Sequence, residues 1–345
     1  MENAMKALVY VAPGKMKIEY RPIPTLEADD VLIRVESCGI CGSDVSGYLG
    51  KTGRRIPPVI MGHEFSGVIA ALGEKVQGLS KGQRVTAQPI RFCGECSFCR
   101  AGKTNLCSNQ TMLGVLSTDG AMAEYVKVSA KQVVPIPEGV DFDTAALAEP
   151  FAVAYSAVKK GDVAGKDVAV VGTGTIGLMM IAALRMNGAN RIYAMDLEEG
   201  KRRAALTMHA DIAFDPRDEE AFAAMIEQTG GGVDVVFEAV GAETAVSSAI
   251  SSLKKAGTAV WVGNMIPIIR LNMQQIVTRE LLIKGNFDYT QESFAETVQN
   301  LSRLDFSGWI EYAEGLEDAI EAFHQIGNQE RNSIKTIIHI GGETK

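Results

Sequence analysis

An apolar strand that runs directly into a glycine-rich turn is the feature that most restricts the fold of this chain. Residues 168–171 read Val-Ala-Val-Val, and a helical stretch begins within the six residues that follow. The glycines of such a turn let the chain close tightly, let backbone N–H groups approach a pyrophosphate, and let the helix pack on the strand. The turn predicts a dinucleotide site, with these candidate contacts: Gly172, Gly174, Thr175, Ile176 and Gly177.

A glycine-rich strand–helix turn that binds no dinucleotide is the alternative, and the next strand argues against it. Residues 191–195 are apolar and end in Asp196, nineteen residues after Gly177, where a carboxylate can accept hydrogen bonds from ribose hydroxyls. Leu197 follows directly, so no cation stands there to neutralise a 2′-phosphate, and NAD is favoured over NADP. Lys201 lies further along, either as a solvated helix side chain or as a further cofactor contact.

The pattern of apolar residues divides the chain into two parts. Up to about Phe151, short alternating runs separated by Gly, Pro and Asp predict a β-rich domain. From Asp167, apolar strands (VAVVG, RIYAMD, VDVVFEAVG, TAVWVGN and LLIKGNF) alternate with helical stretches, which predicts parallel βαβ units and a doubly wound sheet. After about Asp288, two amphipathic helices and the strand KTIIHI could either close the second domain or return to the first.

Composition and charge exclude several classes of partner. A net charge of -8 over 345 residues, with both signs interspersed, leaves no basic stripe for nucleic acid. No apolar stretch is long enough to predict a membrane span. Four of the six cysteines lie between positions 93 and 107, which is typical of metal binding in a reducing compartment, so we expect a cytoplasmic protein.

Two sets of cysteines point to metal sites. Four thiols within fifteen residues, with no open position, favour a tetrahedral structural zinc over an iron–sulfur cluster or two disulfides; they are Cys93, Cys96, Cys99 and Cys107. Cys38 and Cys41 lie in the motif CGICGSD and have no second pair, whereas His63 and Glu64 form a nearby ligand-rich segment. One cysteine, His63 and a carboxylate would suit a catalytic zinc, but spacing alone does not identify the cysteine or the acid.

Five motifs in order along the chain resemble the zinc-containing medium-chain dehydrogenase/reductase family, in its polyol dehydrogenase branch. They are CGICGSD at 38–44, GHE at 62–64, the cysteine lobe at 93–107, AEP at 148–150 and GTGTIG at 172–177. The resemblance implies an α/β protein with a GroES-like β-barrel catalytic domain (1–152 and 288–345) and a Rossmann NAD-binding domain (153–287). In such an arrangement the C-terminal tail returns to the barrel.

The resemblance also implies roles for individual residues. Catalytic zinc ligands would be Cys41, His63 and Glu149, with Glu64 as an alternate or water-bridged ligand and Cys38 as a buried non-ligand. Ser43 would hydrogen-bond the reacting oxygen, and Asp44 would orient the ligand histidine. Many members carry a histidine three residues after this serine to relay the proton, and this chain has Ser46 there. The expected reaction is hydride transfer from a secondary alcohol of a polyol or sugar-derived substrate to NAD, with two zinc ions per chain.

Several further expectations remain open at this stage. Strand-end residues resemble contacts to the nicotinamide, although simple strand-end packing explains them equally well: Val240, Val262, Gly263, Asn286 and Phe287. Lys51, Arg54 and Arg55 could bind an anionic group of the substrate, or form a solvated basic loop. The uncharged segment 258–269 resembles edges through which family members dimerise, so we expect a homodimer or homotetramer. A catalytically inactive zinc-stabilised binding protein and an L-threonine or diol dehydrogenase are the alternative functions.

Overall fold

The computed structural model describes residues 4–306, 308–328, 330 and 334–341, and the chain divides into two compact units. The first unit comprises Met1–Glu149 and Thr290–Lys345, and the second comprises Pro150–Tyr289. None of the helices in the described parts of the chain has the length and apolar character needed to cross a membrane.

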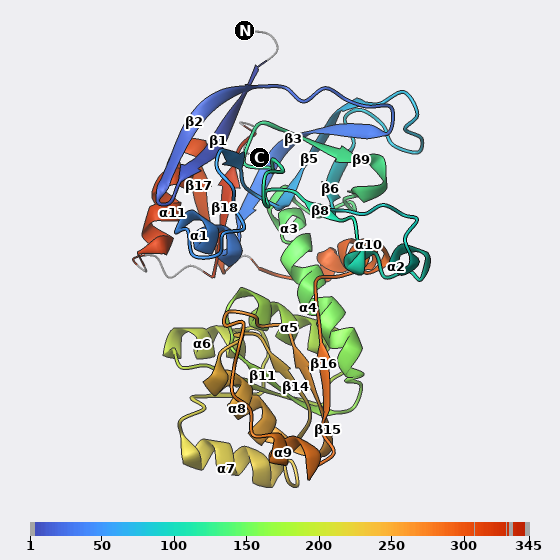
Figure 1. Ribbon diagram of the computed structural model, residues 1–345. Helices are drawn as coiled ribbons and strands as arrows, with labels where there is room; N and C mark the ends of the chain where they lie inside the picture. The colour runs from blue at the N-terminus through green and yellow to red at the C-terminus, as the bar shows by residue number, and fades with distance from the viewer. Residues whose placement is uncertain (1–3, 307, 329, 331–333, 342–345) are drawn as a thin grey trace. The chain divides into compact units, whose positions relative to one another are not determined.

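The first unit is built mainly of β-strands, as the alternating pattern predicts (Figure 1). Its strands are β1 (Ala4–Ala12), β2 (Lys15–Pro22), β3 (Asp30–Ile40), β4 (Val59–Ile60), β5 (Glu64–Leu72), β6 (Arg84–Ala87), β7 (Ile90–Arg91), β8 (Thr111–Met112), β9 (Tyr125–Ser129), β10 (Val133–Pro135), β17 (Ile310–Glu314) and β18 (Lys335–His339). Its α-helices are α1 (Gly42–Tyr48), α2 (Ser97–Arg100), α3 (Phe142–Ala146), α10 (Gln291–Asn300) and α11 (Leu316–Gly327), with short 3₁₀ turns at Thr104–Leu106, Ala130–Gln132 and Leu301–Arg303.

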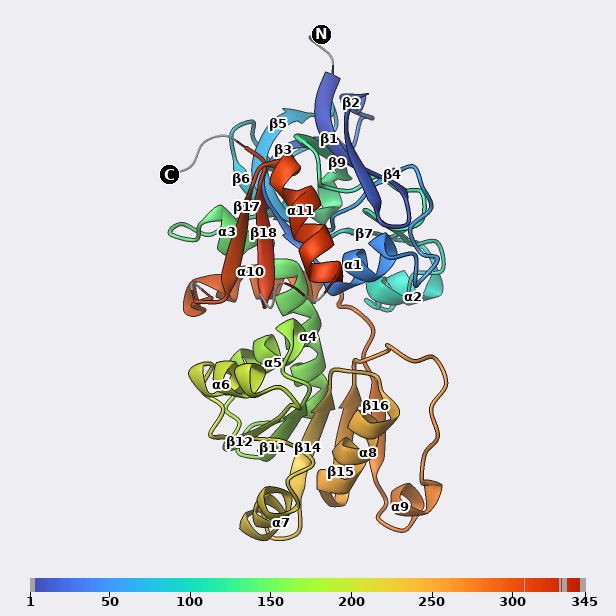
Figure 2. The same cartoon turned by 90° about the vertical axis from the view of Figure 1, so that its left-hand side faces the viewer.

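The C-terminal tail returns to the sheet of the first unit. The main sheet has the order β10-β6-β5-β3-β18-β17, with β9 also paired to β3. Strand β18 lies beside β3 (Figure 2) and runs antiparallel to it. In this pairing Ile338 faces Cys38 and Thr336 faces Ile40. Helix α11 packs its apolar face, including Leu316 and Phe323, into the same core. Residues near position 335 therefore meet the motif at 38–44 although almost 300 residues separate them.

The second unit is a doubly wound parallel sheet, which confirms the expectation from the alternating strands and helices. The strand order is β13-β12-β11-β14-β15-β16, and every adjacent pair is parallel. Its strands are β11 (Asp167–Val171), β12 (Arg191–Met195), β13 (Ile212–Phe214), β14 (Val233–Glu238), β15 (Leu253–Trp261) and β16 (Leu282–Gly285). Its helices are α4 (Ala148–Gly161, beginning at the end of the first unit), α5 (Thr175–Met186), α6 (Glu199–Thr207), α7 (Glu219–Gln228), α8 (Glu243–Ser252) and α9 (Met273–Val277).

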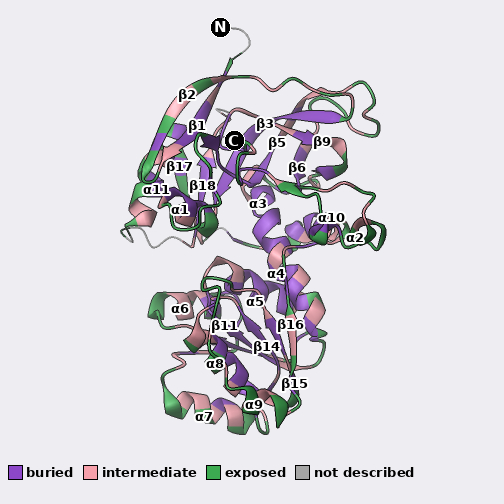
Figure 3. Ribbon diagram, viewed as in Figure 1, coloured by how far each residue is buried: buried purple, intermediate pink, exposed green. Residues whose placement is uncertain are grey.

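Burial explains why most strands of the second unit can be predicted from the sequence. The central strands are buried on both faces, so β11 is apolar after Asp167 and β14 is apolar except at Asp234 and Glu238 (Figure 3). Strand β13, at one edge of the sheet, has three residues and was not predicted from the sequence. The strand order reverses between β11 and β14, and open α/β sheets bind ligands beside the carboxyl ends of strands at such a switch point.

Candidate functional site

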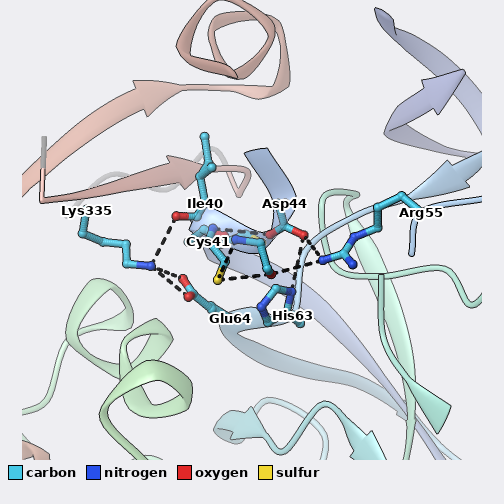
Figure 4. Close-up of polar contacts among 10 residues, drawn as sticks. Ile40, Cys41, Asp44, Arg55, His63, Glu64 and Lys335 are labelled. Atoms are coloured by element: carbon cyan, nitrogen blue, oxygen red, sulfur yellow. Dashed lines mark hydrogen bonds and ion pairs between the residues drawn. The ribbon is translucent and has the colours of Figure 1, made fainter. Parts of the chain in front are cut away.

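Cys41, His63 and Glu64 lie together in the first unit. Cys41 caps the N-terminus of α1, where its Sγ accepts a hydrogen bond from Ser43 N at 3.5 Å. Glu64 begins β5, directly after His63. One ligand atom from each of the three residues lies within 4.8 Å of the other two (Figure 4). The structure thus brings together the CGICGSD and GHE motifs, whose ligands spacing alone could not pair.

A buried ion pair lies on one side of this cluster. Arg55 Nη2 donates to Asp44 Oδ1 at 2.8 Å and to Ser43 Oγ at 3.3 Å, and the side chains of Arg55 and Asp44 are 3% and 0% exposed. Asp44 Oδ1 also lies 3.5 Å from His63 Nδ1. Burial opposes ionisation of Asp44, but His63 and Arg55 outweigh burial and lower its pKa to about 2. Asp44 is therefore an anion that can orient the His63 ring.

A second buried ion pair lies on the opposite side of the cluster in Figure 4. Lys335 Nζ donates to both carboxylate oxygens of Glu64, at 2.6 and 2.8 Å, and to Ile40 O at 3.2 Å. Burial lowers the pKa of Lys335, but Glu64 and the other nearby anions raise it by more than burial lowers it. The net shift is upward, so the ammonium stays charged. Gly39 faces Glu64 across the sheet, and a Cβ at Gly39 would overlap the Glu64 carboxylate.

The other residues expected around the catalytic metal lie in different settings. Glu149 is buried at the second position of α4 and is outside the three-residue group, although its charge contributes to the raised pKa of Lys335. Cys38 is fully buried, and burial raises its thiol pKa well above the usual range. Ser43 is exposed, with Oγ 3.3 Å from Cys41 Sγ, and Ser46 is half-buried.

The donor set and the charges of this cluster suit a zinc ion. A thiol, an imidazole and a carboxylate are all zinc ligands. Within the part of the chain that the structure describes, His63 Nδ1 is buried and makes no hydrogen bond that meets normal geometry. Arg55 balances Asp44 and Lys335 balances Glu64, so neither of these cations is left to balance a Cys41 thiolate. A divalent cation would supply positive charge beside that thiolate.

Four other cysteines, Cys93, Cys96, Cys99 and Cys107, form a second compact group of thiols. All four Sγ atoms lie within 4.8 Å of one another, with Cys93 3.5 Å from Cys107 and 3.9 Å from Cys99. A tetrahedral zinc with Zn–S bonds of about 2.3 Å requires S–S separations of about 3.8 Å. Backbone N–H groups also donate to these sulfurs, lowering the pKa of Cys96 to about 6. All six cysteines of the chain are free thiols, so the two-disulfide alternative is not formed.

The glycine-rich turn has the geometry expected of a phosphate-binding loop. Gly172 follows β11 with φ of 89°, a conformation that L side chains rarely adopt, and Gly174 caps α5. Thr175 and Ile176 lie half-exposed in the first turn of α5. A Cβ on Gly177 would overlap the carbonyl of Gly172, so only glycine permits this close approach of helix and strand.

Asp196 closes the other side of this loop. Its Oδ2 accepts from Thr173 N at 2.8 Å, and its Oδ1 accepts from Glu198 N at 3.0 Å. Lys201 is ion-paired with Glu198 at 2.6 Å. Arg202 donates to the main-chain carbonyls of Asp196 and Leu197. The nearby cations therefore already have partners within the unit.

The strand-end residues lie at the carboxyl ends of β14, β15 and β16. Val240, Val262 and Gly263 are half-buried, and Phe287 is 41% exposed. Asn286 is buried, and its amide contacts Ser156 Oγ at 3.3 Å and Asp288 O at 3.3 Å. Packing within the unit thus accounts for the position of Asn286 without a ligand, whereas the side chain of Phe287 is accessible.

The structure corrects the expectation for the basic loop and adds one residue that the sequence did not indicate. Lys51 and Arg54 are exposed, but Arg55 is buried against Asp44, so it is neither solvated nor free to hold a substrate anion. Lys335 was not among the candidates, because its partner Glu64 is 271 positions away. The only sequence signal for a role of Lys335 in the site was its position: it is a lysine at the start of an apolar strand, in a tail expected to return to the barrel.

Comparison with known proteins identifies both units. Residues 27–138 match the family model for the alcohol dehydrogenase GroES-like domain, and residues 175–303 match that for the zinc-binding dehydrogenase. Sorbitol dehydrogenase of Bacillus subtilis (strain 168) is 37% identical over 294 residues, covering 83% of this chain and 82% of that protein. D-xylulose reductase A of Aspergillus oryzae is 34% identical, covering 96% of each chain.

A solved structure extends the likeness to the whole fold. The zinc-binding dehydrogenase of Sinorhizobium meliloti 1021, bound to NADP, superposes with a TM-score of 0.88 at 30% identity, covering 97% of this chain and 99% of that one. The expected combination of a GroES-like domain and a Rossmann domain is therefore confirmed. This chain is an alcohol dehydrogenase that belongs to the polyol dehydrogenase branch of the zinc-containing medium-chain dehydrogenase/reductase family.

Proposed function

We propose that this enzyme oxidises a secondary alcohol of a polyol, sugar alcohol or sugar-alcohol phosphate to a ketose-type product and reduces NAD. The observation that carries this proposal is the Cys41–His63 pair, which lies beside buried carboxylates. The same chain also has a glycine-rich turn that is hydrogen-bonded to Asp196. Residues 1–152 and 288–345 would hold the metal ions and the substrate, and 153–287 would hold the dinucleotide.

Cys41, His63 and Glu149 are the proposed ligands of the catalytic zinc. Glu64 is the alternate ligand, because both of its oxygens are hydrogen-bonded to Lys335 and would have to give up that contact to reach a metal. Cys93, Cys96, Cys99 and Cys107 would hold a second, structural ion. Metal analysis should find about two zinc ions per chain; one or none would contradict this assignment.

When bound, zinc favours ionisation of the alcohol, and the dinucleotide accepts the hydride. The protein controls the proton through Ser43. A guanidinium can only donate, so the Ser43 oxygen accepts from Arg55 and its own proton is directed toward Cys41 or the substrate oxygen. Ser43 is exposed, so it can pass a proton directly to water. This route would make a relay histidine at position 46 unnecessary.

NAD is the proposed cofactor because Asp196 would repel a 2′-phosphate and both neighbouring cations are already paired. The Sinorhizobium meliloti relative binds NADP, so the choice requires measurement with both nucleotides. At equal concentrations, the kcat/KM for NAD should exceed that for NADP. A preference for NADP would overturn this part of the proposal.

A substrate panel tests the reaction class. Sorbitol, xylitol, galactitol 1-phosphate, L-threonine and 2,3-butanediol would each be supplied with NAD, and the reverse reaction would be run with D-xylulose and NADH. We expect the highest kcat/KM for a polyol, abolished by a chelator and by Cys41→Ser. Turnover of threonine or butanediol alone would favour the alternative dehydrogenases. Dinucleotide binding without turnover of any substrate would favour an inactive binding protein.

The remaining basic residues of the loop define a narrower test for a phosphorylated substrate. Lys51 and Arg54 are exposed, whereas Arg55 is committed to Asp44. If the loop binds a phosphate, Arg54→Ala should raise KM for galactitol 1-phosphate and leave sorbitol unchanged. Equal effects on the two substrates would indicate a solvated loop.

We also propose a homodimer or homotetramer in the cytoplasm. Strand β16 is an edge strand of the parallel sheet. Exposed apolar side chains lie in this strand and in the segment that precedes it: Met265, Ile268, Met273, Val277 and Leu282. Exposed apolar residues next to an unpaired strand edge are typical of an interface. Light scattering after size-exclusion chromatography tests this, and a monomer would contradict it. Six free thiols agree with a reducing compartment.

A further inference from the structure

Glu238 is a fully buried acidic residue at the carboxyl end of β14, outside the metal sites. Its Oε1 accepts hydrogen bonds from Val240 N at 2.8 Å and from Gly241 N at 2.7 Å. Its main-chain oxygen accepts from Val262 N at 2.9 Å and from Gly263 N at 3.1 Å. One residue thus holds four N–H groups in the two loops that follow β14 and β15.

The same two loops are packed against each other and against the glycine-rich turn. A Cβ on Gly241 would overlap Asn264 N, and a Cβ on Gly263 would overlap Gly241 N. A Cβ on Gly172 would overlap a methyl group of Val240, and Ala239 N donates to Val171 O at 2.9 Å. The backbone spacing of three loops at the switch point of the sheet is therefore fixed around Glu238.

The second carboxylate oxygen of Glu238, Oε2, is buried without a hydrogen bond from any of the described residues, which is energetically unfavourable for the folded protein. Burial raises the pKa of this carboxyl, and the two backbone N–H groups only partly oppose that shift. Buried polar atoms without partners are rare in folded proteins, and those that persist call for an explanation.

We propose that Glu238 is a positioning residue for the dinucleotide: it holds the loops after β14 and β15 at the spacing that the nicotinamide half of the cofactor requires. This inference rests on the proposed dinucleotide site and adds a residue that makes no contact with the cofactor itself. A carboxylate oxygen can accept two N–H groups at once, which no apolar side chain can do.

The test compares Glu238→Ala, Glu238→Gln and Val236→Ala in the full-length protein. Gln keeps an oxygen that can accept both N–H groups, whereas Ala removes it. Val236 is buried two positions earlier in the same strand and packs into the core, so its replacement controls for a general loss of stability. NADH and NADPH binding would be followed by fluorescence, and amide hydrogen exchange would be measured for residues 239–243 and 262–265 without ligand.

We expect Glu238→Ala to speed exchange in both loops and to raise the Kd for the preferred nucleotide by about tenfold to a hundredfold. Glu238→Gln should keep the exchange protection and stay within about threefold of the wild-type Kd, and Val236→Ala should leave the Kd unchanged while lowering Tm. Unchanged exchange in Glu238→Ala, faster exchange with an unchanged Kd, or equal losses in the Ala and Gln variants would each overturn the inference. If the wild type binds neither nucleotide, the proposed function fails, and the inference fails with it as a statement about the cofactor.

Discussion

Replacing Lys335 by Met should destabilise the metal-free first unit by about 3–5 kcal/mol at pH 7. The substitution keeps an unbranched side chain but removes the cation that binds both oxygens of Glu64, whose side chain is 0% exposed. Breaking a buried ion pair by removing one partner costs about 3–5 kcal/mol.

The two tryptophans allow the first unit to be followed alone. Trp309 lies in the first unit and Trp261 in the second, so a Trp261→Phe background leaves fluorescence from the first unit only. Urea unfolding of chelator-treated protein would be measured at pH 7. Lys127→Met is the matched control, because Lys127 pairs with Asp30 at 3.4 Å on the same sheet but is 33% exposed, and exposed pairs contribute about 0–1 kcal/mol.

The cost should shrink in two situations. It should fall in the double variant with Glu64→Gln, and in the zinc-loaded protein, where the metal would supply positive charge close to Glu64. A loss for Lys335→Met no larger than that for Lys127→Met would show that the pair is not isolated from solvent. A loss for Lys335→Met that is the same in the Glu64→Gln background would refute the argument that an uncompensated Glu64 charge is its cause.

Four further predictions follow from the same geometry. Ser43→Ala should lower kcat by about 10²- to 10⁴-fold with unchanged zinc content, because it removes the hydroxyl beside Cys41; an unchanged kcat would exclude Ser43 from proton transfer. Asp196→Asn keeps an acceptor for Thr173 N but removes the charge, so the ratio of kcat/KM for NADP to that for NAD should rise; a constant ratio would contradict the repulsion argument. Cys99→Ser and Cys41→Ser should each lower the zinc content by about one ion per chain, and Cys99→Ser should lower Tm more because its site has no open position. Burial lowers the pKa of His339, but Asp143 and Glu314 raise it by more, so the folded-state pKa lies above the usual value. The charged ring therefore stabilises the fold fully below about pH 6.5, and this stabilisation is lost as pH rises through the folded pKa. The urea midpoint of His339→Gln should lack this loss.

Local signals in the sequence were sufficient for the second unit. Its central strands are buried on both faces, and the turn at Gly172 needs glycine for reasons that act within a few residues. The strand β13 was missed because three residues at a sheet edge are too few to carry a periodic signal. Sequence spacing also identified the four-cysteine group, because its ligands span only fifteen residues.

The charge arrangement around Cys41 was beyond such reasoning because its members come from distant segments. Arg55 looked like one of three equivalent basic loop residues, and only the fold shows that it is buried against Asp44. Lys335 reaches Glu64 because β18 pairs with β3, a pairing that the residues alone left undecided. Long-range strand pairing, which local patterns do not encode, decided the position of Lys335.

The tail strand β18 links the stability of the first unit to the chemistry of its candidate site. It fills the place between β3 and β17 in the sheet, so it is required for pairing on both sides. Its first residue, Lys335, also neutralises Glu64, because its ammonium binds both carboxylate oxygens. Under the proposed ligand assignment, with Glu149 as third ligand, this ion pair would hold Glu64 away from the metal. The contact that joins the tail strand to the site would then also leave a coordination position for the substrate.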